Sequence, residues 1–144
     1  MPKLIKISKE GMKEYIPYLM NELGYDNKEE LLKDDENIEN TFQMNYHGKP
    51  AGFINCEKHY YIRDFDVLTS FRRKGIGSMM LKEIEKKARK EGYDAITLHV
   101  AANNKIAINC YKKNGFKIEG KNETNHKGRI CSKYLMEKKL HKYL

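Results

Sequence analysis

The chain has 144 residues, which is enough for one hydrophobic core without the help of metals or disulfides. Apolar residues make up 40% of it and charged residues 33%, a composition typical of globular proteins. No apolar run approaches the roughly 20 residues that a membrane span needs, and the N-terminus lacks the apolar stretch of a secretory signal. We therefore expect a cytoplasmic protein without a membrane partner.

Cysteine and histidine usage argues against disulfides and metals. The three cysteines (Cys56, Cys110 and Cys131) are odd in number and widely spaced, so a disulfide framework is not expected. The chain has no Cys-x-x-Cys pair, and its five histidines lie far apart. The sequence therefore predicts no metal site.

The charge is distributed unevenly along the chain, whose formal net charge is +8. Residues 1–50 carry 7 Lys/Arg and 10 Asp/Glu, whereas residues 51–144 carry 21 and 10. A strongly positive region favours an anionic partner. Nucleic acid and a phosphorylated cofactor both fit this balance, and so does a basic surface that is simply solvated.

Apolar patterning in the first half of the chain predicts a strand, two helices and a three-stranded meander. The expected ranges are a strand over 3–7, helices over 9–23 and 28–36, and strands over 38–46, 51–58 and 59–68. The first two meander strands are joined by His47-Gly48-Lys49-Pro50, which is a good turn sequence.

In the second half of the chain the spacing of apolar residues changes to that of a helix, and strand-like segments follow. Ile76, Met80, Ile84 and Ala88 recur at every fourth residue, which predicts a helix over 75–91. A strand over 95–100, a helix over 104–113 and two closing strands over 116–119 and 130–138 follow. No linker or repeat interrupts this order, so it predicts a single α/β domain over residues 1–144 with a mixed sheet.

The segment between Val67 and Ser78 is the most specific local signal. A strand ends, a polar turn follows, and Arg72-Arg73-Lys74-Gly75-Ile76-Gly77 opens the amphipathic helix. The first turn of a helix offers backbone amides and a partial positive charge, and glycine lets an anion approach them. A dinucleotide fingerprint fails at Met80, and no Walker loop is present. An accidental glycine turn with a basic cap is the plain alternative.

Two spaced motifs resemble a known family. Val67-x-x-x-x-Arg72-x-x-Gly75-x-Gly77 and Asn104-x-x-Ala107-x-x-x-Tyr111-x-x-x-Gly115-Phe116, separated by a helix and a strand, resemble the acetyl-CoA-binding core of GNAT N-acetyltransferases. The resemblance covers residues 60–120. It implies a mixed, mostly antiparallel central sheet with splayed central strands flanked by helices, the GNAT-like acyl-CoA N-acyltransferase fold.

The resemblance also implies which residues hold acetyl-CoA, the expected co-substrate. Backbone groups left free at the end of the third meander strand would bind the pantetheine arm and polarise the thioester carbonyl; they belong to Asp66, Val67 and Leu68. The pyrophosphate would be held by Arg72, Arg73, Lys74, Gly75, Ile76, Gly77 and Ser78. Asn104 would either bind pantetheine or cap its helix, and Ala107 would leave room for the cofactor.

Three residues are candidates for the proton transfers. Tyr111 matches the family position whose phenol faces the coenzyme sulfur, which makes it the candidate general acid. His99 stands on one face of its strand, where an imidazole can take the proton of the amine. Tyr61 falls where some protein N-terminal acetyltransferases have a tyrosine that assists this histidine. For each residue the plain alternative is a structural role without proton transfer.

The sequence does not identify the molecule that accepts the acetyl group. A primary amine is expected, either a small molecule or a protein N-terminus or lysine. Arg63 stands where polyamine-acetylating relatives carry a carboxylate, which argues against that acceptor. The acidic stretch 26–39 would attract a cationic amine, although a solvated acidic helix is the commoner explanation of such a stretch. The loop Lys121–Gly128 could line the acceptor entrance.

Two other functions remain as alternatives. A basic nucleic-acid-binding module fits the charge, but aromatic residues are not interleaved with the basic ones and no recognition helix is evident. A non-catalytic CoA-binding domain would keep the glycine turn without the proton-transfer residues. The sequence is compatible with a homodimer and does not fix the oligomeric state.

Overall fold

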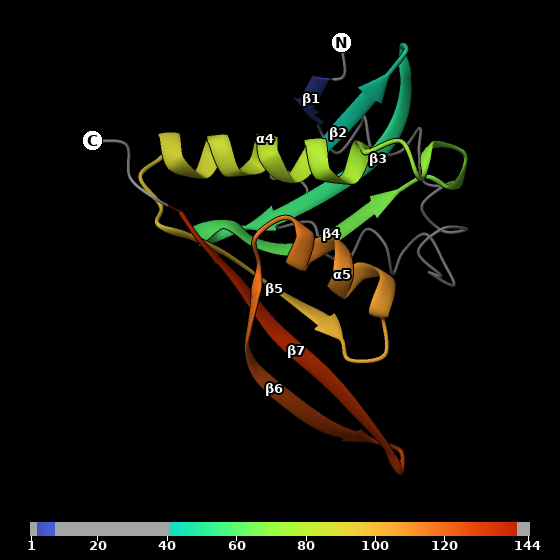
Figure 1. Ribbon diagram of the computed structural model, residues 1–144, viewed down its shortest axis with the longest axis vertical. Coiled ribbons are helices and arrows are strands. Elements are labelled where there is room, and N and C mark those ends of the chain that lie inside the picture. The colour runs from blue at the N-terminus through green and yellow to red at the C-terminus, as the bar shows by residue number, and fades with distance from the viewer. Residues whose placement is uncertain (1–2, 8–40, 141–144) are drawn as a thin grey trace. The chain divides into compact units, whose positions relative to one another are not determined.

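The computed structural model describes residues 3–7 and 41–140, and Figure 1 shows their strands and helices. The helices expected over 9–23 and 28–36, the start of the strand expected over 38–46 and the acidic stretch 26–39 all lie outside the described residues. The strands are β1 (Lys3–Lys6), β2 (Thr41–Tyr46), β3 (Lys49–Glu57), β4 (Tyr61–Val67), β5 (Ala95–Ala101), β6 (Lys117–His126) and β7 (Arg129–Lys139). The helices are η2 (Lys58–Tyr60), η3 (Thr69–Phe71), α4 (Ile76–Lys90) and α5 (Lys105–Lys113).

The strands form one mixed sheet in the order β1-β2-β3-β4-β5-β7-β6. Neighbouring strands of this sheet pair antiparallel in the β1–β2, β2–β3, β5–β7 and β6–β7 ladders, whereas β4 and β5 pair parallel. The parallel ladder joins Tyr61 to Thr97 and Ile62 to Leu98, and β4 then continues to Val67. The predicted fold class, a mixed and mostly antiparallel sheet with helices, is confirmed.

The described residues form two compact units, and each is considered by itself. The first comprises the described residues up to Glu57 together with Asp64–Met80, and the second comprises Lys58–Arg63 and the described residues from Leu81 onward. Both contain fully buried apolar side chains. In the first unit these are Met44, Ile54, Ile76 and Met80, and in the second they are Ile84, Ile96, Leu98 and Met136.

The periodic helix is α4, and its predicted apolar stripe is confirmed. Ile76, Met80, Ile84 and Ala88 are all buried, with at most 1% of their surface exposed. A spacing of four residues keeps these side chains on one face of the helix, which leaves the basic and acidic residues of α4 on the other faces. The glycine that follows, Gly92, has a left-handed φ of 88°, as a helix C-terminus often requires.

The start of the third meander strand was predicted wrongly. Residues 58–60 form the short helix η2, in which His59 and Tyr60 have φ values of 63° and 56°. These left-handed conformations are uncommon outside glycine. Strand β4 therefore begins only at Tyr61.

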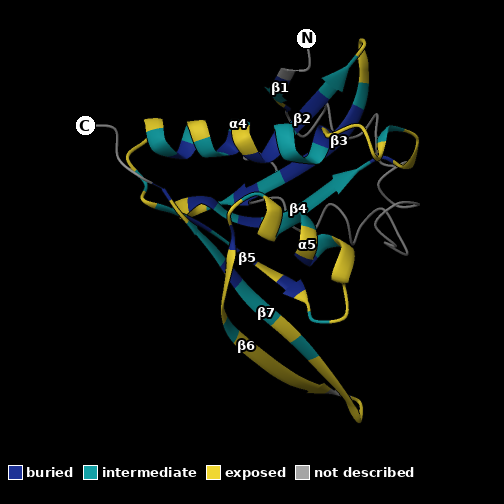
Figure 2. Cartoon of the chain, in the orientation of Figure 1, coloured by how far each residue is buried: buried dark blue, intermediate teal, exposed yellow. Residues whose placement is uncertain are grey.

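The closing strands were predicted too short. β6 and β7 form a long hairpin in which Asn122 pairs with Lys133 and Asn125 with Ile130, so the predicted loop Lys121–Gly128 is almost entirely strand (Figure 1). Figure 2 shows most of β6 as exposed. From Lys121 to His126 the strand is polar throughout, so cross-strand hydrogen bonds, and not burial of one face, hold this outer part of the hairpin together.

Gly52 in β3 is required by packing. A Cβ atom at this position would lie 2.8 Å from the Asp66 carbonyl oxygen in β4 and 2.8 Å from the Met80 sulfur in α4. The Asp66 carbonyl belongs to the backbone and cannot move aside on its own. Strand β4 and helix α4 could therefore not both keep their positions if residue 52 carried a methyl group.

We predict that Gly52→Ala lowers the free energy of unfolding by about 1–3 kcal/mol through this overpacking. Urea denaturation followed by circular dichroism measures the change. Gly120→Ala is the matched control, because the nearest atom to its added methyl is the Leu135 Cβ at 4.0 Å. Equal unfolding midpoints for the two variants would contradict the packing argument.

Candidate active site

The turn between β4 and α4 presents the first amides of the helix. Gly75 adopts a left-handed φ of 75°, and Arg73 one of 64°, which lets the chain turn sharply from η3 into α4. The Gly75 carbonyl accepts the Met79 N–H at 3.1 Å, the first hydrogen bond of the helix. The amides of Ile76 and Gly77 precede this bond, so they have no acceptor within the helix and are suited to bind an anion.

The three cationic side chains of the turn, Arg72, Arg73 and Lys74, have different surroundings. Arg72 donates from Nε to the Val67 carbonyl at 2.8 Å and pairs with Asp66 at 3.3 Å, so it ties the turn to the end of β4. The Lys74 ammonium lies 5.8 Å from the ring centres of both Tyr46 and Phe71, within cation–π range. Arg73 is exposed beside them.

Two backbone groups that the sequence analysis expected to be free are already hydrogen-bonded. The Leu68 N–H donates to the Ala51 carbonyl at 2.8 Å, which extends the pairing with β3. The Val67 carbonyl accepts from Arg72. The expectation of unpaired groups is therefore wrong for these two atoms, because the end of β4 is anchored by a neighbouring strand and by the turn that follows.

Gly75 and Gly77 are glycines for different reasons. Gly75 needs its left-handed conformation, although its Cβ would meet open space. Gly77 lies inside the helix, and its Cβ would meet Phe65 and Val67 at 3.4 and 3.7 Å, which is ordinary contact. Neither the backbone nor the packing at Gly77 requires glycine, and glycine destabilises a helix relative to alanine. A ligand that lies close to this first turn would explain why residue 77 is a glycine.

Strand pairing in the second unit brings Tyr61 and His99 together. The Tyr61 hydroxyl lies 2.6 Å from His99 Nδ1, and the other ring nitrogen, Nε2, lies 3.4 Å from the side-chain nitrogen of Asn122. His99 is exposed, so its ring can meet a substrate from solvent. The sequence analysis missed Asn122 because its residue was assigned to a loop, and only the β6 register places it near the imidazole.

Tyr111 lies in the last turns of α5, where its ring packs 5.7 Å from that of Phe116. Burial raises the pKa of Tyr111 to about 12, and the neighbouring Cys110 thiol acts in the same direction. The phenol therefore keeps its proton throughout the neutral range. A phenol that remains protonated can donate to a departing thiolate.

The remaining candidates lie on the same helix. The Asn104 side chain accepts the Ala107 N–H at 3.2 Å, so Asn104 is the N-cap of α5. Ala107 is partly buried. Among the residues that the structure describes, no cluster of His, Cys, Asp or Glu could hold a metal ion, and no helix is long and apolar enough to cross a membrane.

A family comparison decides the class of this protein. A model of the acetyltransferase (GNAT) family matches residues 5–116, which include the glycine turn, the Tyr61–His99 pair and Tyr111. The chain belongs to the GNAT acetyltransferase family. The predicted resemblance is thereby confirmed.

Curated GNAT relatives match part of this chain. The Drosophila melanogaster protein named "Probable N-acetyltransferase san" is 42% identical over 72 residues, which are 49% of this chain and 39% of that protein. The matched segments span about two fifths of the curated relatives.

Solved GNAT structures align over nearly the whole chain. Arabidopsis thaliana Naa50 in complex with the bisubstrate analogue CoA-Ac-MVNAL has a TM-score of 0.73 at 27% identity, covering 95% of this chain and 97% of that one. A GNAT acetyltransferase from Elizabethkingia anophelis with acetyl-CoA bound has a TM-score of 0.72 at 18% identity, covering 96% and 98%. The second likeness shows the fold alone.

We predict that the Tyr111 phenol titrates near pH 12 rather than near 10, because burial disfavours the phenolate. The difference in phenolate absorbance between the parent protein and Tyr111→Phe isolates this one tyrosine among ten. Stopped-flow pH jumps record the signal before alkaline unfolding. A difference signal that develops around pH 10 would show that the ring is not desolvated.

Proposed function

We propose that this GNAT protein transfers the acetyl group of acetyl-CoA to a primary amine, and that the α-amino group of a peptide is the favoured acceptor. The hydrogen-bonded Tyr61–His99 pair carries the proposal, since it supplies a proton acceptor on an exposed strand position of a GNAT fold. The likeness to a relative solved with a peptide-bearing bisubstrate analogue supports the choice of acceptor.

The residues would divide the reaction into two proton transfers. His99 takes the proton of the attacking ammonium at Nε2, directly or through water, in place of the long 3.4 Å contact with Asn122, while Nδ1 stays hydrogen-bonded to the Tyr61 hydroxyl. The amine nitrogen then forms its bond to the thioester carbon as the carbon–sulfur bond breaks. Tyr111 gives its proton to the departing sulfur. The proton that the nitrogen loses on becoming an amide restores the Tyr111 phenol through water, which the raised pKa of Tyr111 favours. His99 releases its proton to solvent. The products are an amide and free CoA.

The helix turn would hold the cofactor's pyrophosphate. The amides of Ile76 and Gly77 supply oriented donors, and the partial positive charge of the α4 N-terminus adds to the attraction. Arg72 fixes the turn against β4, and Arg73 and Lys74 contribute positive charge at its surface. The missing side chain at Gly77 would let a phosphate approach these amides closely.

Gly77→Ala separates binding from folding. We predict that the variant is as stable as the parent or slightly more stable, because alanine is the better helix residue by roughly 0.5–1 kcal/mol. Its affinity for acetyl-CoA should fall by about tenfold or more, since the methyl displaces the phosphate from the amides. Thermal denaturation and isothermal titration calorimetry measure the two quantities.

Gly92→Ala is the control for that variant, because Gly92 is left-handed and lies beyond the far end of α4. It should lose stability and keep the affinity for acetyl-CoA. If Gly77→Ala binds acetyl-CoA as tightly as the parent protein, the turn does not hold the pyrophosphate.

Turnover should depend on both proton-transfer residues. With acetyl-CoA and a panel of short peptides, we predict that Tyr111→Phe and His99→Gln each lower kcat by about 100-fold, because general acid and base groups contribute factors of this size. Release of the CoA thiol provides the measurement. Tyr93→Phe and His59→Gln, whose rings contact each other in the same unit, are the matched controls.

The panel also tests the acceptor. Each peptide is compared with the same peptide carrying a blocked N-terminus and with the polyamine spermidine. Activity that persists on blocked peptides or prefers spermidine would refute an α-amino acceptor. Tight acetyl-CoA binding with no thiol release on any amine would favour the non-catalytic alternative.

A further inference from the structure

One face of β5 and β7 in the second unit carries charged side chains on both sides of His99. Directly paired residues of neighbouring strands share a face, and every second residue of a strand returns to it. His99 pairs with Leu135, and Ala101, two residues further along β5, pairs with Lys133. Lys133 is therefore on the same face as His99 and is its diagonal neighbour, with Cα atoms roughly 7–8 Å apart.

This face, which we call the His99 face, is not the one that forms the core. Leu98 and Val100 belong to the opposite face of β5 and are at most 7% exposed, whereas His99 and Ala101 are exposed. Lys133 is exposed as well. A ligand that reaches His99 from solvent therefore also meets the Lys133 ammonium.

The side chain of Asn122 gives separate evidence that Lys133 lies close to the imidazole. Asn122 pairs directly with Lys133 across the β6–β7 ladder, and its side-chain nitrogen lies 3.4 Å from His99 Nε2. Directly opposed residues have Cβ atoms about 4.5–5.5 Å apart. Lys133 is thus a nearest neighbour of the side chain that contacts the imidazole.

The charge of Lys133 is not neutralised within the hairpin. The only acid in residues 120–135 is Glu123. It pairs with Ser132 in the ladder, which places it on the face opposite to Lys133, and it forms an ion pair with Lys121 at 3.5 Å. Within the described ranges 3–7 and 41–140, Lys133 forms no ion pair with a carboxylate.

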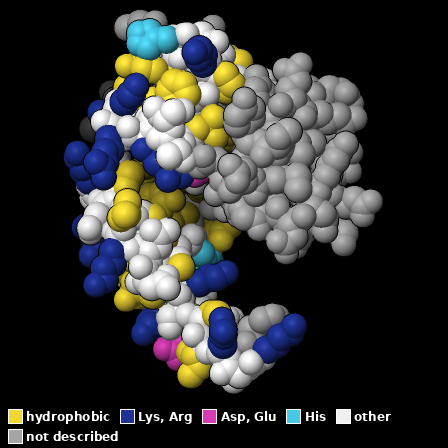
Figure 3. Space-filling model, turned by 90° about the vertical axis from the view of Figure 1, so that its right-hand side faces the viewer, with side chains coloured by type: hydrophobic (Ala, Val, Ile, Leu, Met, Phe, Trp, Pro, Cys, Tyr) yellow, Lys and Arg dark blue, Asp and Glu magenta, His cyan; other side chains and the backbone are white. Residues whose placement is uncertain are grey.

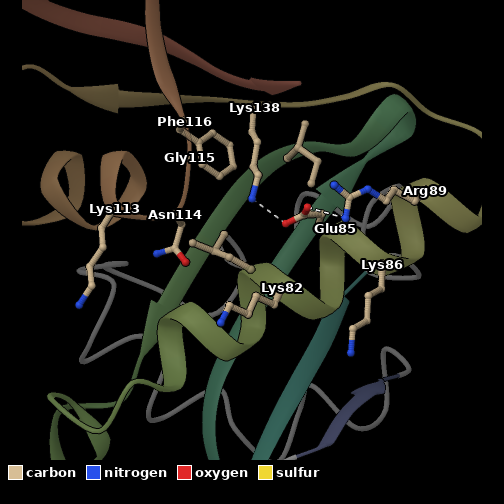
Figure 4. Close-up of a pocket in the computed structure, with 11 residues that line it drawn as sticks. Lys82, Glu85, Lys86, Arg89, Lys113, Asn114, Gly115, Phe116 and Lys138 are labelled. Carbon is tan, nitrogen blue, oxygen red and sulfur yellow. Dashed lines mark hydrogen bonds and ion pairs between the residues drawn. The ribbon is translucent and has the colours of Figure 1, made fainter. Parts of the chain in front are cut away.

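The other face of the same strand shows the contrast. Lys138 donates to the Glu85 carboxylate at 2.7 Å, and Figure 4 shows the two side chains directed at each other. Figure 3 shows Lys and Arg side chains outnumbering acidic ones over the described part of the surface that it displays. An exposed cation that no carboxylate offsets attracts an anionic group, and Lys133 is such a cation beside His99.

Glu137 is the diagonal neighbour of His99 on the other side. It pairs with Thr97, two residues before His99, so it also belongs to the His99 face. Its carboxylate attracts an ammonium and repels a second carboxylate, although Lys117, directly opposite on β6, offsets part of this charge. The side of the imidazole that favours an anionic group is therefore the Lys133 side.

We propose that Lys133 selects acceptor peptides that carry an acidic side chain at their second or third residue. The inference deepens the proposed function and rests on it, because it takes the α-amino group of the peptide to meet His99. An extended chain advances about 3.3 Å per residue. A peptide that starts at His99 and runs along the His99 face therefore reaches the level of Lys133 by its third residue.

A solvated lysine without a partner is the plain alternative. Exposed ion pairs are weak and lose strength as salt rises, so the expected preference is a factor of about two to five for one pair. Reversal of the charge at residue 133 is the sharper probe, because it turns attraction into repulsion and should change which peptide binds best.

The test measures peptide binding to protein saturated with CoA, so that it does not depend on turnover. Fluorescence anisotropy compares peptides labelled at the C-terminus that differ only in having Glu, Gln or Lys at the second and third residues. We expect the parent protein to bind the Glu peptide about threefold more tightly than the Gln peptide and about tenfold more tightly than the Lys peptide. Both ratios should approach one in about 1 M salt.

Variants assign the preference to one side chain. Lys133→Gln should bind all the peptides equally, and Lys133→Glu should bind the Lys peptide most tightly, which a purely structural lysine would not cause. Lys139→Gln is the matched control. Lys139 is an exposed cation on the same face of β7, six residues from Lys133, and its loss should keep the order of the parent protein.

Equal affinity for the three peptides, no measurable binding of any of them, or an unchanged order in Lys133→Glu would overturn the proposal. Release of the CoA thiol from acetyl-CoA with the same peptides tests the proposed function separately. If the peptides are discriminated in binding but none is acetylated, Lys133 remains the selecting residue and the proposed acetyl transfer is refuted.

Discussion

The structure depends on how the chain passes from β4 into α4. The turn must stop a strand, reverse direction and present the first amides of a helix, and it does so with a left-handed Gly75 and a left-handed Arg73. Arg72 then fixes the turn by binding the Val67 carbonyl and Asp66. A helix N-terminus held in this way is preorganised for an anion, because its donors need no rearrangement when a phosphate arrives.

The two residues that we propose for proton transfer lie in opposite environments. His99 is exposed on its strand and hydrogen-bonded at Nδ1 to the Tyr61 hydroxyl, so it can exchange a proton with an incoming amine. Tyr111 is packed against Phe116, and burial holds its proton in place. Under the proposed function, an accessible proton acceptor kept apart from a desolvated proton donor would let one protein carry out both proton transfers near neutral pH.

A pocket of the second unit, lined by residues of α4, the end of α5 and the end of β7, shows how an internal ion network shapes the charge of a surface. Glu85 already forms ion pairs with Arg89 and Lys138 within the second unit. It therefore does not neutralise the other lysines that line the pocket. Part of the surplus positive charge of residues 51–144 therefore lies around a pocket that is also lined by the buried side chains of Leu81, Ile96 and Phe116. Composition alone could not distinguish a solvated basic surface from a binding site, because the two differ only in which carboxylates lie near the cations.

The sequence by itself determined the features that arise from neighbouring residues. The four-residue period of Ile76, Met80, Ile84 and Ala88 specified α4, and the glycine turn specified its N-terminus, because helix geometry and left-handed turns are local. Tertiary structure decided what depends on distant pairing. The β6–β7 register placed Asn122 beside His99, and the Ala51 carbonyl of β3 accepted the Leu68 N–H. Residues of α4, α5 and β7 came together to line one pocket. Strand register and side-chain convergence are set by contacts between residues far apart in the chain, and no local pattern records them.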